Sequence, residues 1–293
     1  MNDQRSTMNG IDMNVIVAKS AGFCMGVRRA VNNVLNLTTV EENKKICVLG
    51  PLIHNKQVND MLRKKHVMIA NSIDDISGEI CVIRTHGISP QKKDELIKRN
   101  VEIFDATCPR VLKVQNVIKK HAEKGYFIII VGDKGHAEVE GLLGFTNENG
   151  MVVDAVDRIN EIPSHVQKIC VVAQTTQNYE TFKKIELLLK EKYSDCVVFD
   201  TICGSTSERQ QEVIEMAGIV DAIAIVGGSE SANTMRLVEI SRSTGVPTYH
   251  VETHNDINKK DFSVFQKIGV SAGASTPNIT VHQVAECLRS IEK

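Results

Sequence analysis

Short apolar runs that end at a glycine recur along the chain and set its pattern. They read ICVLG at 46–50, IIIVG at 128–132 and IAIVG at 223–227, and each is followed by a polar loop and by apolar residues at helical spacing. A further apolar run closes each stretch, as ICVIR at 80–84, ICVVA at 169–173 and IGVSA at 268–272. Near-continuous apolar runs that alternate with helices are typical of parallel strands buried on both faces. The pattern therefore predicts an α/β protein with mainly parallel sheets covered by helices.

The repeating unit is also marked by a cysteine between a short strand and a helix. VIVAKSAGFC ends at Cys24, IFDATC at Cys108 and VFDTIC at Cys203, and apolar residues at helical spacing follow each one. Three copies of one unit predict three modules related by pseudo-threefold symmetry, a trefoil. The expected parts are a flexible leader over 1–12 and modules over 13–107, 108–200 and 201–293. The strand over 14–19 has no unit before it, so we expect it to complete the sheet of the third module.

Length and charge narrow the class of protein. A chain of 293 residues suggests two domains by length alone, and the repeat replaces this with three smaller ones. Lys and Arg number 35 against 36 Asp and Glu, and this balance argues against a protein that binds nucleic acid or an anionic membrane. No apolar run approaches the roughly 18 residues that span a bilayer, and the polar start of the chain predicts a cytoplasmic protein.

The eight cysteines divide by position. A reducing compartment argues against a disulfide framework, so these thiols are core residues, metal ligands or catalytic groups. Three of them lie inside apolar strands and are expected in the core, namely Cys47, Cys81 and Cys170. A pseudo-threefold arrangement would bring Cys24, Cys108 and Cys203 to one centre. Three thiolates suit a soft metal or an iron–sulfur cluster, in which one iron would keep an open, Lewis-acid position.

The loops after the strands carry polar side chains at the edge where parallel sheets bind their ligands. His54, His86 and His136 fall there, and Glu138 follows the last of them by two residues. Hydroxyl or amide groups before helices complete the set, namely Thr175, Ser231, Asn233 and Ser275. Each of these alone would equally be a helix cap, but helix starts also bind phosphate. A carboxylic acid in a dry site holds a proton near neutral pH, so Glu138 is the expected proton donor.

Seven motifs in one order carry a resemblance to a known family. They are AGFCMGVRRAV, GPLIHNKQV, DATCPRV, GHAEVEG, QTT, ICGSTSERQ and AGASTP, which run from about residue 20 to 277. The chain resembles the 4-hydroxy-3-methylbut-2-enyl diphosphate reductases of the non-mevalonate isoprenoid pathway. The resemblance implies three α/β modules around an oxygen-sensitive 4Fe–4S cluster held by Cys24, Cys108 and Cys203. A 3Fe–4S form, which lacks the labile fourth iron, is expected after exposure to air.

The resemblance also implies a reaction and a site. The reaction is reductive dehydroxylation of (E)-4-hydroxy-3-methylbut-2-enyl diphosphate, whose hydroxyl binds the open iron, to isopentenyl and dimethylallyl diphosphate. The sequence has no P-loop and no dinucleotide fingerprint, so the electrons are expected from reduced ferredoxin or flavodoxin. The implied catalytic residues are Glu138, Thr175 and His136. The implied diphosphate-binding residues are His54, His86, His136, Thr175, Ser231, Asn233 and Ser275.

Three positions depart from the family pattern. Ala232 replaces a serine before Asn233, which removes one phosphate-binding hydroxyl, a loss of about 1 kcal/mol. Ala137 replaces a proline, and Thr85 stands where alanine is common. Two other hypotheses use the same three thiols. One is a zinc-dependent hydrolase or lyase acting on a phosphorylated substrate, and the other is a non-enzymatic iron–sulfur sensor.

Overall fold

The computed structural model describes residues 13–291, so the expected leader over 1–12 lies outside the described residues. Over the described range the chain forms three four-stranded sheets, and every pairing of strands is parallel. This confirms the predicted α/β class with parallel sheets and interleaved helices. The chain divides into two compact units. One comprises Phe23–Glu208, and the other joins the residues up to Gly22 to those from Arg209 onward.

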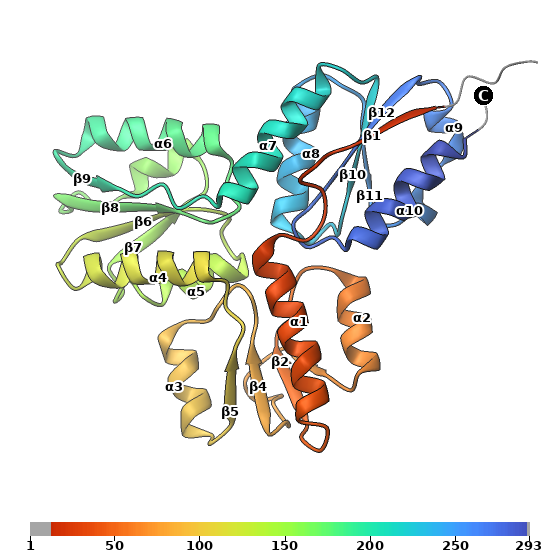
Figure 1. Cartoon of the computed structure of the whole chain (residues 1–293). Coiled ribbons are helices and arrows are strands. Elements are labelled where there is room, and N and C mark those ends of the chain that lie inside the picture. The colour runs from red at the N-terminus through yellow and green to blue at the C-terminus, as the bar shows by residue number, and fades with distance from the viewer. Residues whose placement is uncertain (1–12, 292–293) are drawn as a thin grey trace, which may run out of the picture. The chain divides into compact units, whose positions relative to one another are not determined.

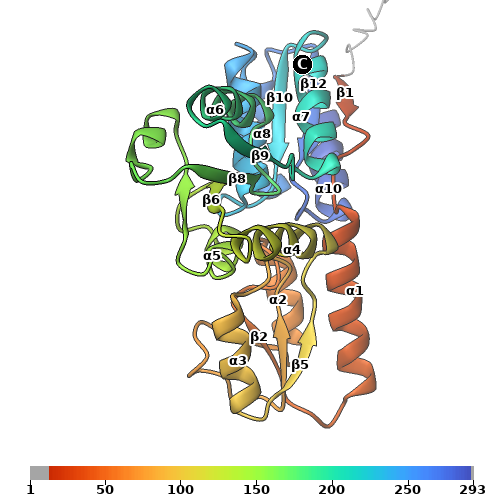
Figure 2. The ribbon, with the colours of Figure 1, turned by 90° about the vertical axis from the view of Figure 1, so that its left-hand side faces the viewer.

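The first sheet of the unit Phe23–Glu208 is covered by helices on both faces. Its strand order is β3 (Met68–Ala70), β2 (Ile46–Leu49), β4 (Ile80–Ile83) and β5 (Glu102–Asp105). One face packs against α1 (Met25–Val40) and α2 (Lys56–Lys64), and the other against α3 (Pro90–Lys98). Figure 2 shows α1 and α3 on opposite sides of β2 and β5.

The second sheet of this unit repeats that plan. Its order is β7 (Gly150–Val153), β6 (Phe127–Val131), β8 (Lys168–Ala173) and β9 (Asp195–Val198). One face packs against α4 (Pro109–Ala122) and α5 (Ala137–Leu143). The other packs against α6 (Tyr179–Lys192) and the 3-10 helix η1 (Val156–Glu161), and Figure 1 shows α6 and α4 on opposite sides of these strands.

The third sheet lies in the other compact unit and takes a strand from the start of the chain. Its order is β11 (Thr248–Val251), β10 (Ala222–Val226), β12 (Lys267–Ala272) and β1 (Asn14–Val17). β1 pairs with β12 from Asn14 with Lys267 to Val17 with Val270, and the red and blue strands of Figure 1 lie side by side. It takes the place in its sheet that β5 and β9 take in theirs.

Helices cover this sheet in the same way. One face packs against α7 (Gly204–Ala217), which begins in the other unit, and α8 (Ala232–Ser243). The opposite face packs against α9 (Lys259–Phe262) and α10 (Asn278–Arg289), and the 3-10 helix η2 (His254–Asp256) precedes α9. The same architecture therefore serves all three sheets of the described chain.

The apolar runs form the strands because both of their faces are covered. Every residue of β2, β4, β6 and β10 is buried. A fully buried Val, Leu or Ile side chain contributes about 1.5–3 kcal/mol relative to its exposed state. Cys47, Cys81 and Cys170 lie in this core as predicted. Burial raises the pKa of Cys81 and of Cys170 to about 12, so these groups remain thiols.

A glycine at the end of a central strand makes room for a side chain from the neighbouring strand. Gly50 follows β2 with φ +75, and a Cβ there would lie 2.5 Å from Nη1 of Arg84, which follows β4. Gly132 follows β6, and a Cβ there would lie 3.0 Å from Oε1 of Gln174, which follows β8. Arg84 and Gln174 therefore occupy equivalent corners of the two sheets, at the edge where ligands bind.

Candidate functional site

The three cysteines of the repeat lie at helix starts. Cys24 and Cys108 are the N-cap residues of α1 and α4, and Cys203 directly precedes α7. The N–H of Cys108 donates to the carbonyl of Thr85 at 3.0 Å, and that of Cys203 to the carbonyl of Thr175 at 2.9 Å. The first turns of these helices, all in the described range, carry no acidic residue. All three thiols therefore lie where the free backbone N–H groups of a helix start are gathered.

The sulfur atoms of Cys24 and Cys108 converge on Gly26. A Cβ on Gly26 would lie 2.7 Å from the Cys108 Sγ and 3.9 Å from the Cys24 Sγ. Burial raises the pKa of the Cys108 thiol, and the neighbouring Cys24 and Cys203 act in the same direction. The absence of a side chain at Gly26 thus keeps open the space beside two of the thiols.

The donor set of the repeat is three thiols. Three thiolates suit a soft metal ion or an iron–sulfur cluster. Cys24, Cys108 and Cys203 all lie in the compact unit Phe23–Glu208, and Gly26 leaves space beside two of them. These residues therefore fit an iron–sulfur cluster with three protein ligands.

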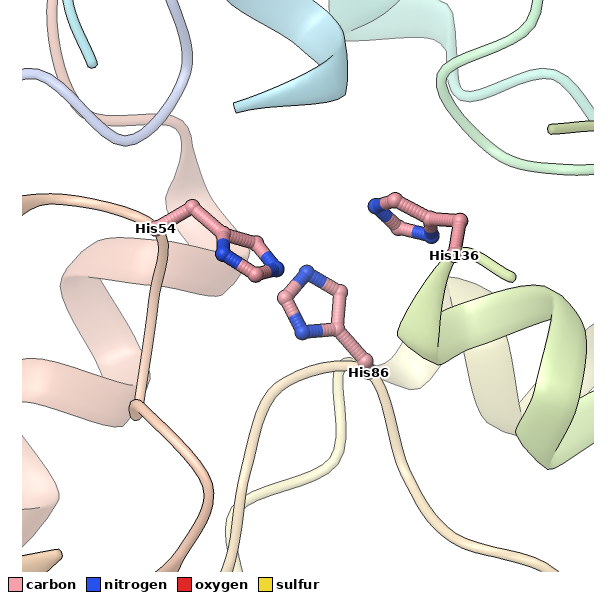
Figure 3. Close-up of side chains that lie close together, drawn as sticks. All are labelled: His54, His86 and His136. Carbon is pink, nitrogen blue, oxygen red and sulfur yellow. The ribbon is translucent and has the colours of Figure 1, made fainter. Parts of the chain in front are cut away.

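The structure brings together three histidines from three separate loops (Figure 3). His54 follows β2, His86 follows β4, and His136 is the N-cap residue of α5. The ring centroids are 4.9 Å apart for His54 and His86, 5.3 Å for His86 and His136, and 5.8 Å for His54 and His136. One nitrogen from each ring lies within 4.8 Å of the others, so this geometry would suit either an anion or a metal ion.

At least two of these rings are neutral at pH 7. Burial lowers the pKa of His136 to about 4, and His54 and Arg84 add to this effect. Burial also lowers the pKa of His86 well below its usual value. The Nδ1 atom of His136 accepts a hydrogen bond from the N–H of Glu138 at 3.2 Å, which leaves its proton on Nε2. A neutral imidazole with one N–H group can donate to an oxyanion.

Glu138 is a buried acid held by Thr175. The N–H of Thr175 donates to Oε1 at 2.6 Å, and its hydroxyl donates to Oε2 at 2.7 Å. Burial raises the pKa of Glu138 to about 7, although both bonds from Thr175 act in the opposite direction. Because Glu138 is 2 % exposed, its proton has little access to water. The carboxyl group is therefore placed to give or take a proton near neutral pH.

The residues around the start of α8 belong to the other compact unit. Ser231 caps the helix by accepting from the N–H of Thr234 at 3.4 Å, and the hydroxyl of Ser275 donates to Ser231 Oγ at 3.1 Å. Asn233 is 4 % exposed, and neither atom of its amide has a hydrogen-bond partner among residues 13–291. A buried amide without partners indicates a ligand-binding group. That these residues share one ligand with the histidines stays a prediction.

Sequence reasoning missed Arg84 and Gly26. Arg84 lies two residues before His86 in the RTHGISP loop, and its charge lowers the pKa of both His86 and His136. Its position in that loop, close to His86, was the sequence signal that could have identified it. Nothing in the sequence marks Gly26 as a neighbour of Cys108, because the two residues lie far apart along the chain.

Comparisons with known proteins cover almost the whole chain. Residues 15–289 match the family model of the LytB protein. The 4-hydroxy-3-methylbut-2-enyl diphosphate reductase of Aquifex aeolicus is 38% identical over 95% of this chain and 97% of its own. The enzyme of that name from Geobacter metallireducens is 36% identical over 96% of this chain and 98% of its own.

Solved structures agree with these relatives. The E-1-hydroxy-2-methyl-but-2-enyl-4-diphosphate reductase of Plasmodium falciparum has a TM-score of 0.89 at 28% identity, covering 94% of this chain and 87% of its own. A structure of (E)-4-hydroxy-3-methyl-but-2-enyl diphosphate reductase, the terminal enzyme of the non-mevalonate pathway, has a TM-score of 0.69 at 38% identity. It covers 95% of this chain and 100% of its own. Separately, none of the helices in the described part of the chain has the length and apolar character needed to cross a membrane.

Proposed function

The chain belongs to the LytB protein family, and we propose that it reduces (E)-4-hydroxy-3-methylbut-2-enyl diphosphate. In this reaction two electrons and two protons replace the allylic C–O bond by a C–H bond and release water. The products are isopentenyl diphosphate and dimethylallyl diphosphate. The observation that carries the proposal is a buried acid, Glu138, with a pKa of about 7, in the compact unit that also holds the three cysteines of the repeat.

Cys24, Cys108 and Cys203 would hold a 4Fe–4S cluster. When bound, the cluster would supply the two electrons and one iron without a protein ligand, a Lewis-acid position for the hydroxyl group. The electrons are expected from a separate donor, reduced ferredoxin or flavodoxin. The relatives named as reductases favour the reductase over the zinc hydrolase, and the presence of Glu138 argues against a sensor without catalysis.

Glu138 would deliver protons, and Thr175 would control when it does so. At neutral pH about half of the Glu138 carboxyls hold a proton, given a pKa of about 7. After the proton leaves, the N–H and the hydroxyl of Thr175 both donate to the carboxylate and stabilise its charge. The carbonyl of the same residue binds the N–H of Cys203, so Thr175 links the acid to a proposed cluster ligand.

The diphosphate would bind to neutral donors. His86 and His136 would each offer an N–H group, and His54 lies beside both. In the other unit, Ser231, Asn233 and Ser275 offer hydroxyl and amide donors at the start of α8, and their part in binding the diphosphate stays a prediction. Each hydrogen bond to a charged phosphate oxygen contributes about 1.5–3 kcal/mol.

Anaerobic turnover with reduced viologen tests the proposal. The purified protein is expected to be brown, to contain iron and sulfide, and to convert the hydroxymethylbutenyl diphosphate into both products, measured by mass spectrometry. An intact cluster without product would favour the sensor. A colourless protein with one zinc ion would favour the hydrolase or lyase.

A further inference from the structure

Arg84 lies at the ligand edge of the first sheet, and it is not among the residues assigned to the proposed reaction. Its guanidinium packs over Gly50, where an added Cβ would lie 2.5 Å from Nη1 and 3.0 Å from Cζ. Gly50 begins the loop that carries His54, and Arg84 itself is two residues from His86. The guanidinium therefore lies against the first residue of the loop that carries His54. Arg84 itself belongs to the loop that carries His86.

Arg84 forms no ion pair with a carboxylate within residues 13–291, and its Nε is buried there without a hydrogen-bond partner. Burial lowers the pKa of Arg84, and no neighbouring acid opposes that effect. Arg84 as a whole is half-buried. A partly buried charge without a counter-charge fits a place where a ligand brings the opposite charge.

The second sheet shows that this corner does not require a cation. Gln174 occupies the equivalent place over Gly132. Its Oε1 accepts from the N–H of Asp133 at 2.7 Å, and its Nε2 donates to the hydroxyl of Thr176 at 2.9 Å. A neutral side chain thus fills the corner with both of its polar atoms satisfied. Packing alone does not explain the arginine at the corner beside the histidines.

We propose that Arg84 supplies the fixed positive charge that attracts the diphosphate to His54, His86 and His136, and that it also keeps a divalent cation away from them. The proposal deepens the function above and rests on it, since both place the diphosphate at these rings. His86 and His136 are neutral and bring donors but no charge, so a fixed cation beside them strengthens the long-range attraction for the anion. The same charge repels a metal ion from three ring nitrogens that are close enough to bind one.

Binding of inorganic pyrophosphate to the anaerobic holoenzyme tests this by calorimetry at low and high salt. We expect Arg84→Gln, which copies the residue of the second sheet, to weaken binding by about tenfold or more and to reduce its salt dependence. Arg84→Lys should stay within about threefold of the wild type because the charge remains. Arg63→Gln, an exposed arginine of α2 in the same module, is the matched control and should leave binding unchanged.

The outcomes separate the two proposals. If the wild type does not bind pyrophosphate, the proposed diphosphate site itself fails. If the wild type binds and Arg84→Gln binds equally well with its cluster absorbance intact, the role of Arg84 alone is overturned. Should Arg84→Gln not fold, Arg84→Lys decides, because a tenfold loss in that variant would contradict a role for charge. Zinc titration provides a second readout, and zinc should bind Arg84→Gln more tightly than the wild type.

Discussion

The corners that follow β4 and β8 have the same backbone and different side-chain chemistry. In both, a threonine carbonyl accepts from the N–H of a cysteine, Thr85 for Cys108 and Thr175 for Cys203. The hydroxyls differ, because Thr85 donates to the carbonyl of Leu52 at 3.1 Å, whereas Thr175 donates to Glu138. The repeated backbone thus positions the cysteines alike, and under the proposed function the side chains place anion binding at one corner and proton transfer at the other.

The largest expected effect concerns the cysteines, which the two corners hold in the same way. Cys108→Ser and Cys203→Ser should each lose most of the bound iron and nearly all turnover, because a serine hydroxyl stays protonated and holds iron poorly. Iron and sulfide content and the visible absorbance measure this. Cys287→Ser, on α10, is the control and should keep its iron. A normal cluster in either of the first two variants would show that the corners are not equivalent.

The next effect tests the acid that belongs to only one corner. Glu138→Gln should keep the cluster absorbance and lower turnover by about 10²–10⁴-fold, the usual contribution of a general acid. Glu140→Gln removes an exposed carboxyl from the first turn of the same helix and should leave turnover unchanged. Single-turnover kinetics under anaerobic conditions measure both. Wild-type rates in Glu138→Gln would remove this residue from the proton-transfer step.

Two threonine variants test whether the two corners have different roles. In the proposed reaction Glu138 acts in its protonated form, so turnover should be full below its pKa of about 7 and fall as the pH rises through it. Thr175→Val removes a hydrogen bond to the ionised carboxylate, which raises this pKa and moves the fall upward by about one pH unit.

Thr85→Val, at the equivalent place, should leave the pH profile unchanged. It should instead lower the free energy of unfolding by about 1 kcal/mol, since the bond to Leu52 is lost. Rates from pH 6 to 9 and denaturant unfolding measure the two effects. Equal shifts of the pH profile in both variants would contradict the division of roles.

The smallest expected effect concerns Ala232, which stands at the start of α8 in place of the serine of the family pattern. Ala232→Ser should restore a hydroxyl at the start of that helix and strengthen pyrophosphate binding by about fivefold, the equivalent of one hydrogen bond. Calorimetry measures the change. Unchanged affinity would indicate that the neighbouring Asn233 and Ser275 already satisfy the ligand.

Much of the fold was accessible from the sequence, because apolar runs and turns repeat along it. Parallel strands end at one edge of a sheet, so residues just after strands gather there, and this is why His54, His86 and His136 could be predicted as neighbours. The importance of Arg84 could not be predicted in this way. It depends on a contact with Gly50 across two strands, and neither periodicity nor spacing encodes such a contact. The module boundaries at 108 and 201 stay a prediction.

The pairing of β1 with β12 has a consequence for how the protein is made. Val17 is translated 253 positions before its partner Val270. β1 can therefore join its sheet only after β12 has been made, whereas the sheets within Phe23–Glu208 form from consecutive segments. Until then, β1 is an unpaired apolar strand in the nascent chain, exposed to chaperones and to aggregation.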